Sequence, residues 1–106
     1  MADPNLERTT STTKGLATWT DEDRYWRENF RSRPYVTADR GYEFYQPAYR
    51  YGYESATQQQ YRGRQWHDVE NELRFGWDRY AHRSANKSTW QEIKDAVRDA
   101  WHRVTG

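Results

Sequence analysis

Two stretches of the chain share one pattern: Trp66-His-Asp-Val-Glu-Asn-Glu-Leu-Arg-Phe-Gly-Trp77 and Trp90-Gln-Glu-Ile-Lys-Asp-Ala-Val-Arg-Asp-Ala-Trp101. Each has an aromatic residue at its start, an apolar residue seven positions later, arginine after eight, a small residue after ten and a second aromatic residue after eleven. Residues 42–53 follow the same pattern, and a more divergent copy begins at Trp19. The starts lie 23 or 24 residues apart, and repeats of such length generally report stacked supersecondary units. We therefore predict an internal repeat of about 24 residues.

The spacing indicates helices rather than strands. At about 100° per residue, offsets 0, 7 and 11 fall within about 40° of arc on a helix, whereas strand alternation would scatter them. Four short helices joined by short loops favour a compact bundle over an open array. The predicted fold is all-α, with one short amphipathic helix per repeat and an antiparallel arrangement.

Capping residues mark the starts of two of these helices. Thr89 followed by Glu92 predicts a capping box at the start of the last helix. Thr20 with Asp23 predicts a weaker box at the first helix. Both helices are therefore expected to begin close to these threonines.

Proline and composition set the other boundaries. Pro47 would remove a hydrogen bond from an established helix, so the second helix is expected to begin at Gln46 or Pro47 and to run towards Gln60. Residues 1–17 are rich in threonine and poor in apolar residues, which predicts a disordered tail. Residues 18–106 are expected to form a single helical domain.

The core must be aromatic. The 106 residues include six Trp, nine Tyr and three Phe, while Leu, Ile and Val together number eight. Aromatic side chains can each bury on the order of 150–250 Å². Small residues at offset ten (Gly52, Gly76 and Ala100) would let a neighbouring helix approach closely. The tryptophans are the predicted core anchors: Trp19, Trp26, Trp66, Trp77, Trp90 and Trp101.

Several classes of function are excluded by what the chain contains. There is no cysteine, and the longest apolar run is two residues, which predicts a soluble, cytoplasmic protein without a membrane contact. No glycine-rich phosphate loop or nucleophile elbow occurs, and the three histidines lack a metal-ligand spacing. We therefore expect no cofactor, no metal ion, no catalytic residue and no enzymatic activity.

One arginine recurs in each copy of the pattern, at the edge of the aromatic stripe: Arg27, Arg50, Arg74 and Arg98. The structural interpretation is that each guanidinium stacks on a Trp or Tyr ring or pairs with an acid. The pairs expected on helical spacing are Asp23 with Arg27, Glu70 with Arg74, and Asp95 with Arg98. The functional alternative is an arginine-lined groove for an anionic ligand.

The connections between helices are basic. Arg31 and Arg33 lie near Tyr35, and Arg62 and Arg64 lie near Tyr61, the mixture with which proteins contact phosphates and stack bases of single strands. The net charge of +1 argues against a strong nucleic-acid binder. Capping of helix C-termini by these arginines is the alternative.

A cluster of tyrosines occupies the second segment: Tyr42, Tyr45, Tyr49, Tyr51 and Tyr53. It could be a core layer or a ring-lined pocket for a flat ligand. Tyr51 falls off the stripe, so we expect it to be exposed and to form a partner-facing surface together with Phe75. The candidate interaction surface therefore comprises Arg27, Arg50, Tyr51, Arg74, Phe75 and Arg98.

Four stretches carry a resemblance to a family: Arg24-Tyr-Trp-Arg-Glu-Asn-Phe30, Tyr45-Gln-Pro-Ala-Tyr-Arg-Tyr-Gly-Tyr53, Trp66-His-Asp-Val-Glu-Asn-Glu-Leu73 and Ala96-Val-Arg-Asp-Ala-Trp101. Residues 23–104 resemble a family of small soluble bacterial proteins with helical repeats rich in aromatic residues and arginine. The resemblance implies an accessory role, in some members beside stress-response proteins. It carries over no catalytic residue, ligand or reaction.

These observations favour a non-catalytic protein that binds another protein or itself, or that has a stress-associated accessory role. The alternative is a weak nucleic-acid or phosphate-binding module that acts through the basic loops. A bundle that binds a small molecule is a third hypothesis.

Overall fold

The computed structural model describes residues 18–80, 82 and 88–105. Over these residues the chain forms four α-helices and two short 3-10 turns, and no strand occurs in this part. The elements are α1 (Trp19–Asn29), η1 (Phe30–Ser32), α2 (Tyr42–Thr57), η2 (Gln59–Tyr61), α3 (Trp66–Trp77) and α4 (Trp90–Thr105). The predicted all-α fold of four short helices is confirmed. The tail predicted over 1–17 lies outside the described residues.

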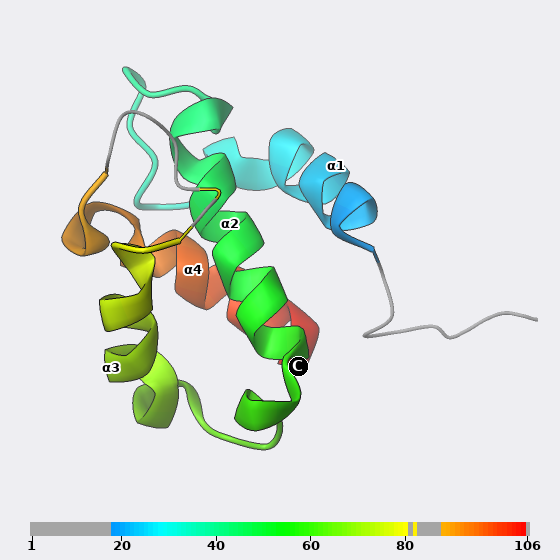
Figure 1. Cartoon of the computed structure of the whole chain (residues 1–106). Helices are drawn as coiled ribbons and strands as arrows, with labels where there is room; N and C mark the ends of the chain where they lie inside the picture. The colour runs from blue at the N-terminus through cyan, green and yellow to red at the C-terminus, as the bar shows by residue number, and fades with distance from the viewer. Residues whose placement is uncertain (1–17, 81, 83–87, 106) are drawn as a thin grey trace, which may run out of the picture.

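Each α-helix begins at the first residue of one predicted segment: Trp19, Tyr42, Trp66 and Trp90. The internal repeat itself remains a prediction. Figure 1 shows α2 in front of α4, with α1 and α3 on opposite sides of α2. The contact between α2 and α4 is the most extensive one between helices of the described chain.

Capping boxes begin α4 and α1. At α4 the Thr89 N–H donates to Glu92 Oε1 at 2.8 Å and the Glu92 N–H donates to Thr89 Oγ1 at 3.4 Å, as predicted. At α1 the box is formed by Thr18 and Asp21, whose N–H groups donate to each other's side chains at 3.4 and 3.3 Å. Because each box satisfies two N–H groups at its helix start, it stabilises that end.

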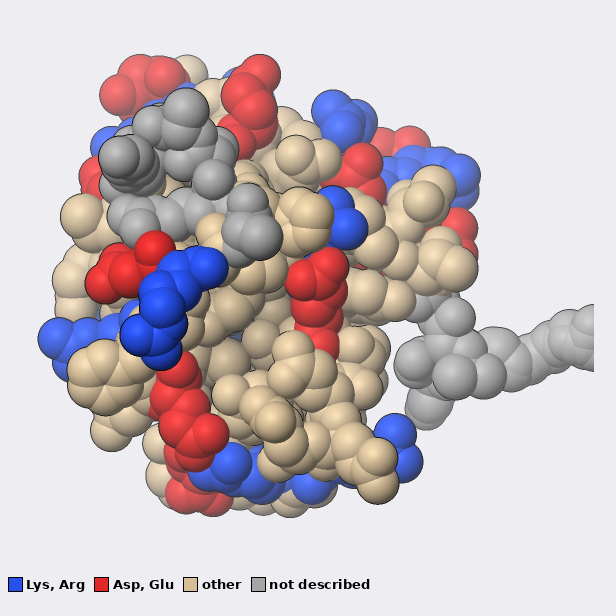
Figure 2. Space-filling model, viewed as in Figure 1, with Lys and Arg blue, Asp and Glu red and all other residues tan. Residues whose placement is uncertain are grey.

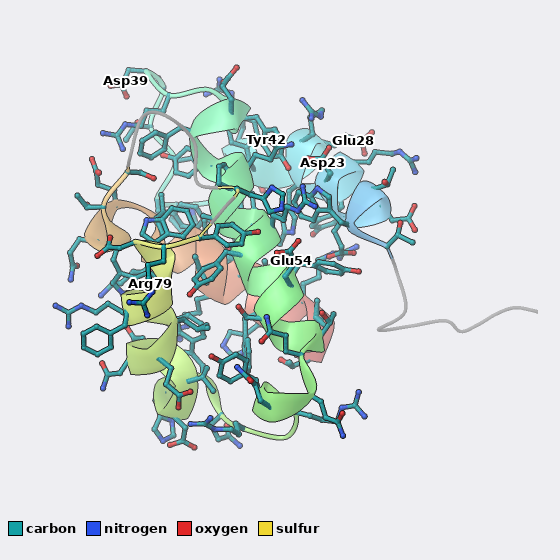
Figure 3. The ribbon with its side chains drawn as sticks, viewed as in Figure 1. Asp23, Glu28, Asp39, Tyr42, Glu54 and Arg79 are labelled. Atoms are coloured by element: carbon teal, nitrogen blue, oxygen red, sulfur yellow. The ribbon has the colours of Figure 1, made fainter. Side chains whose placement is uncertain are left out.

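Asp23, predicted to cap α1 with Thr20, lies in the second turn of that helix and faces α2 instead, so that prediction is wrong. Its carboxylate accepts hydrogen bonds from Arg27 at 3.1 Å, from the Tyr42 hydroxyl at 2.7 Å and from the Gln46 amide at 2.9 Å. Burial alone would raise the pKa of Asp23, but these hydrogen bonds hold the pKa below its ordinary value of 3.8. Figure 3 shows Asp23 and Tyr42 where α1 meets α2.

Pro47 lies inside α2, so the predicted start at Gln46 or Pro47 is wrong. The proline deprives only one carbonyl, that of Glu43, of its helical N–H donor. Tyr42 and Tyr45, which precede the proline, are buried. Burial of these two aromatic side chains outweighs the lost hydrogen bond, because each ring can contribute on the order of 2 kcal/mol or more.

The C-terminal end of α2 falls short of the predicted Gln60. Gln58 takes an extended conformation and ends the helix at Thr57. The chain then forms η2, whose Tyr61 is buried against Trp101 of α4 with ring centroids 6.2 Å apart. Gly63 has a φ of 78°, in the left-handed region that favours glycine, and directs the chain into α3.

Small residues bring α2 and α4 together. A Cβ atom on Gly52 would overlap the backbone carbonyl of Val97 and would lie 2.9 Å from the Cβ of Ala100. A Cβ atom on Gly76 would overlap the hydroxyl of Tyr51. The predicted close approach of a neighbouring helix is therefore confirmed at Gly52 and Ala100, whereas at Gly76 only the hydroxyl end of the Tyr51 side chain approaches.

Aromatic rings fill the core, and four of the six predicted tryptophan anchors are buried: Trp26, Trp77, Trp90 and Trp101. Trp26 stacks on Tyr49 with ring centroids 4.3 Å apart and an interplanar angle of 4°. Trp19 and Trp66 are only partly buried. Both stand at the first position of a helix, at the rim of the core.

Candidate binding site

The recurrent arginines of α1 and α2 are used by the fold, as the structural interpretation predicted. Arg27 pairs with Asp23 at 3.1 Å, and its guanidinium carbon lies 4.7 Å from the ring centroid of Tyr42. Arg50 pairs with Glu54 at 2.8 Å and approaches the ring of Trp19 at 5.8 Å. Both side chains thus pack on rings and pair with acids of the fold, although 58% of the Arg27 side chain remains exposed.

The recurrent arginines of α3 and α4, Arg74 and Arg98, do not form ion pairs as Arg27 and Arg50 do, within the described residues. The predicted pairs of Glu70 with Arg74 and of Asp95 with Arg98 do not form, and no ion pair reaches either arginine within the described part of the chain. Both arginines are exposed. An exposed ion pair on a helix gains only about 0.3–0.5 kcal/mol and must order two long side chains, so hydration competes successfully.

Arg33, one of the predicted phosphate contacts, is held by the fold. Its Nε and Nη2 donate to the two carboxylate oxygens of Asp99 on α4 at 2.7 and 3.1 Å. The Tyr35 hydroxyl also donates to Asp99, at 2.6 Å, and lies 2.8 Å from the Tyr49 hydroxyl. Burial, with the neighbouring Tyr49 and Asp99, raises the pKa of Tyr35 well above its ordinary value. Arg33 therefore fastens its loop to α4 and is not available to phosphate.

The other predicted loop arginines have different surroundings. Arg64 pairs with Glu72 at 2.6 Å and donates to the Asp68 carbonyl at 3.1 Å. The guanidinium carbon of Arg31 lies 4.8 Å from the ring centroid of its neighbour, Phe30. Arg62 is exposed, and no ion pair reaches it among the described residues.

Tyr51 and Phe75, the predicted partner-facing pair, differ in exposure. Tyr51 is only 8% exposed, so its predicted exposure is wrong. Its ring contacts Trp77 and Tyr80 at 5.4 and 4.6 Å, and its hydroxyl donates to the Leu73 carbonyl at 2.7 Å. Gly76 leaves the space for that hydroxyl. Residues of α3 thus cover the Tyr51 ring, which the helical pattern of α2 alone would leave exposed to solvent.

Phe75 is the exposed member of that pair, with 69% of its surface accessible. The other tyrosines of the cluster behave as a core layer: Tyr42, Tyr45 and Tyr49 are buried, while Tyr53 is half-buried beside Trp19 at 5.9 Å. The cluster therefore forms a packed core layer, and not the ring-lined pocket that was the alternative interpretation.

A hollow of about 540 Å³ lies where the segment between η2 and α3 meets the C-terminal end of α4. Arg62, Arg64 and Trp66 line it from one side, and His102 lines it from the other. Its volume is within the range of small-molecule sites. No Asp or Glu side chain lines this hollow among the described residues. We call it the Trp66 hollow.

Trp66 forms one wall of the Trp66 hollow and also of a smaller one. The smaller hollow, of about 260 Å³, is lined by Trp66 with Glu70 of α3 and with Lys94, Asp95 and Arg98 of α4. The indole therefore stands between a side that carries arginine and histidine and a side that carries both cations and carboxylates.

Other rings hold this indole in place. The Trp66 ring lies 6.5 Å from that of Trp90 at an interplanar angle of 16°, 6.1 Å from that of Trp101 and 6.5 Å from that of His102. Because Trp90 and Trp101 are buried, they fix the partly exposed indole at the surface. The site is thus a positioned aromatic ring beside unpaired positive charge.

Charges on the face shown in Figure 2 are mixed, with Lys and Arg side chains close to Asp and Glu side chains over the described residues. Figure 3 shows Glu54 pointing from α2 on that side, where it accepts hydrogen bonds from Arg50 and from the Tyr80 hydroxyl. Ion pairs of this kind neutralise charge locally. Arg62 and Arg98 are among the arginines that no ion pair reaches in the described residues.

Sequence reasoning found parts of this site without bringing them together. Arg62 and Arg64 were predicted to contact phosphate, Arg98 to line an interaction surface, and Trp66 to anchor the core. The contribution of His102 was missed. No local signal reports it, because it depends on how the end of α4 packs against the segment after η2.

The chain matches no protein-family model, no curated protein and no solved structure with which it was compared. Within the described ranges, no group of three or more His, Asp or Glu side chains is arranged to hold a metal ion. The helices of this part are also too short or too polar to cross a membrane.

Proposed function

We propose that this protein is a non-catalytic binding module and that the Trp66 hollow is its binding site. One observation carries the proposal: the hollow places an unpaired cation, Arg62, beside a fixed and partly exposed ring, Trp66, with no carboxylate among its described lining residues. A ligand with an anionic group next to a flat or apolar group could pair with Arg62 and pack against Trp66 at the same time.

The contrast with arginines that meet a carboxylate supports this proposal. Arg33 and Arg40 of the loop between α1 and α2 pair with Asp99 and Glu92, and Arg103 of α4 pairs with Glu22. Their charges serve to connect segments that are distant in sequence. No ion pair reaches Arg62 within the described part of the chain, so its charge is available to a ligand in the hollow.

The test uses 1-naphthyl phosphate, which combines a flat ring with a phosphate. In ¹⁵N-correlated NMR spectra, the indole N–H signal of Trp66, assigned with Trp66→Phe, should shift on titration and saturate. Arg62→Ala should weaken the interaction, because it removes the unpaired cation. Arg79→Ala is the matched control, since Arg79 is also exposed and has no ion pair among the described residues but lies just beyond the other end of α3. An unchanged Trp66 signal, or equal weakening by both variants, would contradict the proposal.

A second candidate function is protein association through α3. It rests on Phe75, which is 69% exposed beside the unpaired Arg74. An exposed ring of this size next to arginine has the composition of interface residues. If the partner is a second copy of this chain, sedimentation velocity should show concentration-dependent association that Phe75→Ser removes. A monomer at all concentrations, or association that survives Phe75→Ser, would reject self-association.

The proposal extends to the cellular setting that the sequence predicts. A bacterial accessory protein of the cytoplasm, in some cases associated with stress, would use such a module to bind a cellular anion or a partner. The resemblance over residues 23–104 and the absence of cysteine support that setting.

A further inference from the structure

Building on the proposed function, we infer that the ligand is a nucleotide unit, an unstacked base with its phosphate, taken from a single-stranded nucleic acid or as a free nucleotide. The base would contact Trp66, and the phosphate would lie in the Trp66 hollow near Arg62 and His102. Proteins bind single strands with this combination of aromatic rings and a positively charged groove.

The two sides of Trp66 differ as a nucleotide requires. The Trp66 hollow carries Arg62 and His102 and has no carboxylate in its described lining, so it suits a phosphate. The smaller hollow carries Glu70 and Asp95 beside two cations, so it suits a phosphate less well, but its carboxylates can accept hydrogen bonds from the amino groups of bases. A base with an amino group therefore fits that side better than thymine.

Lys94 and Arg98 give the smaller hollow its cations. Arg98 has no ion pair within the described residues, so its guanidinium is available to the phosphate of the next nucleotide. A single strand could thus place one phosphate on each side of Trp66. An acidic peptide is disfavoured, because Glu70 and Asp95 would repel its carboxylates and its side chains carry no amino group to donate to them.

The experiment measures binding of fluorescein-labelled (dC)10 and (dT)10 by anisotropy, and of CMP by the Trp66 indole signal. The strand (dC)10 should bind more tightly than (dT)10. The logarithm of its association constant should fall with the logarithm of salt concentration with a slope of about −1.4, as expected for two phosphate contacts on a single strand. Arg62→Ala should reduce that slope by about 0.7, whereas Arg79→Ala should leave it unchanged.

Three other variants separate the contribution of the ring from that of the carboxylates. Trp66→Ala should weaken binding of (dC)10 about tenfold or more, and Trp66→Phe should weaken it less, since phenylalanine still stacks. Trp66→Phe also keeps most of the packing if Trp66→Ala does not fold. Glu70→Gln combined with Asp95→Asn should tighten binding of both strands and reduce the preference for (dC)10.

The outcomes distinguish the inference from the function on which it rests. Binding of CMP alone would support the nucleotide unit and identify a free nucleotide as its source. If 1-naphthyl phosphate shifts the Trp66 signal but neither (dC)10 nor CMP does, the inference is overturned and the proposed function stands. Binding of poly-glutamate at Trp66 in place of (dC)10 would also overturn it. If none of these probes shifts the signal, both fail.

Discussion

Substitution of Gly52 by alanine should destabilise the protein, because no space for a methyl group exists between α2 and α4. The added Cβ would overlap the Val97 carbonyl and would lie 2.9 Å from the Cβ of Ala100. A backbone carbonyl cannot rotate away as a side chain can, so the helices must move apart.

The magnitude follows from two opposing contributions. Overpacking of a tight interior costs about 1–3 kcal/mol, and a clash with backbone belongs at the upper end. Alanine returns about 1 kcal/mol through its higher helix propensity. We expect a net loss of about 2 kcal/mol in the free energy of unfolding, or roughly 8–16 °C in the melting temperature of a domain of this size.

The assay is urea and thermal unfolding followed by circular dichroism and tryptophan fluorescence. Gly76→Ala should cost less than Gly52→Ala, because its Cβ meets only the hydroxyl end of the Tyr51 side chain. Asn71→Ala, at an exposed position of α3, is the control that raises helix propensity without adding a buried methyl group. A Gly52→Ala protein as stable as the wild type would refute the close contact of α2 with α4.

Three further predictions concern stability. Asp99→Asn should cost about 1–3 kcal/mol in urea unfolding, because it weakens the charged hydrogen bonds to Arg33; an equally stable variant would show that these bonds contribute nothing. Because the pKa of Asp23 is lowered in the folded protein, its ionised carboxylate stabilises the fold above pH 3.8, and this stabilisation is lost as the pH falls through the native pKa. Asp23→Asn should therefore make the free energy of unfolding fall less steeply with decreasing pH in the acid range. An unchanged pH dependence would contradict this. Trp101→Ala should cost about 3–5 kcal/mol and Trp66→Ala clearly less, since Trp101 is 1% exposed and Trp66 is only partly buried; equal losses in thermal unfolding would argue against Trp66 as a surface ring.

Periodicity predicted the elements of this fold because it reports what each helix buries. The aromatic residue at offset 0 marks the start of every α-helix, from Trp19 to Trp90, and the box at Thr89 was visible in the sequence. Local rules failed where tertiary contacts were stronger. Pro47 lies within α2 because Tyr42 and Tyr45 before it are buried.

The site was less accessible to sequence reasoning, because its parts come from elements that meet only in the folded chain. Tyr51 lies off the stripe of α2, yet α3 supplies a second wall that buries it. Arg33 and Arg62 stand in similar basic loops, and only the fold shows that Asp99 pairs with the first while no acid among the described residues pairs with the second. This difference separates a structural arginine from a candidate binding residue.

The most direct test of the Trp66 hollow as a binding site is the melting temperature of the wild type and of Arg62→Ala, each with and without saturating 1-naphthyl phosphate. A ligand that binds only the native state raises the melting temperature according to its concentration and dissociation constant. We predict a rise for the wild type and a much smaller rise for Arg62→Ala. No rise for the wild type, or the same rise for both proteins, would contradict the assignment of this hollow as the binding site.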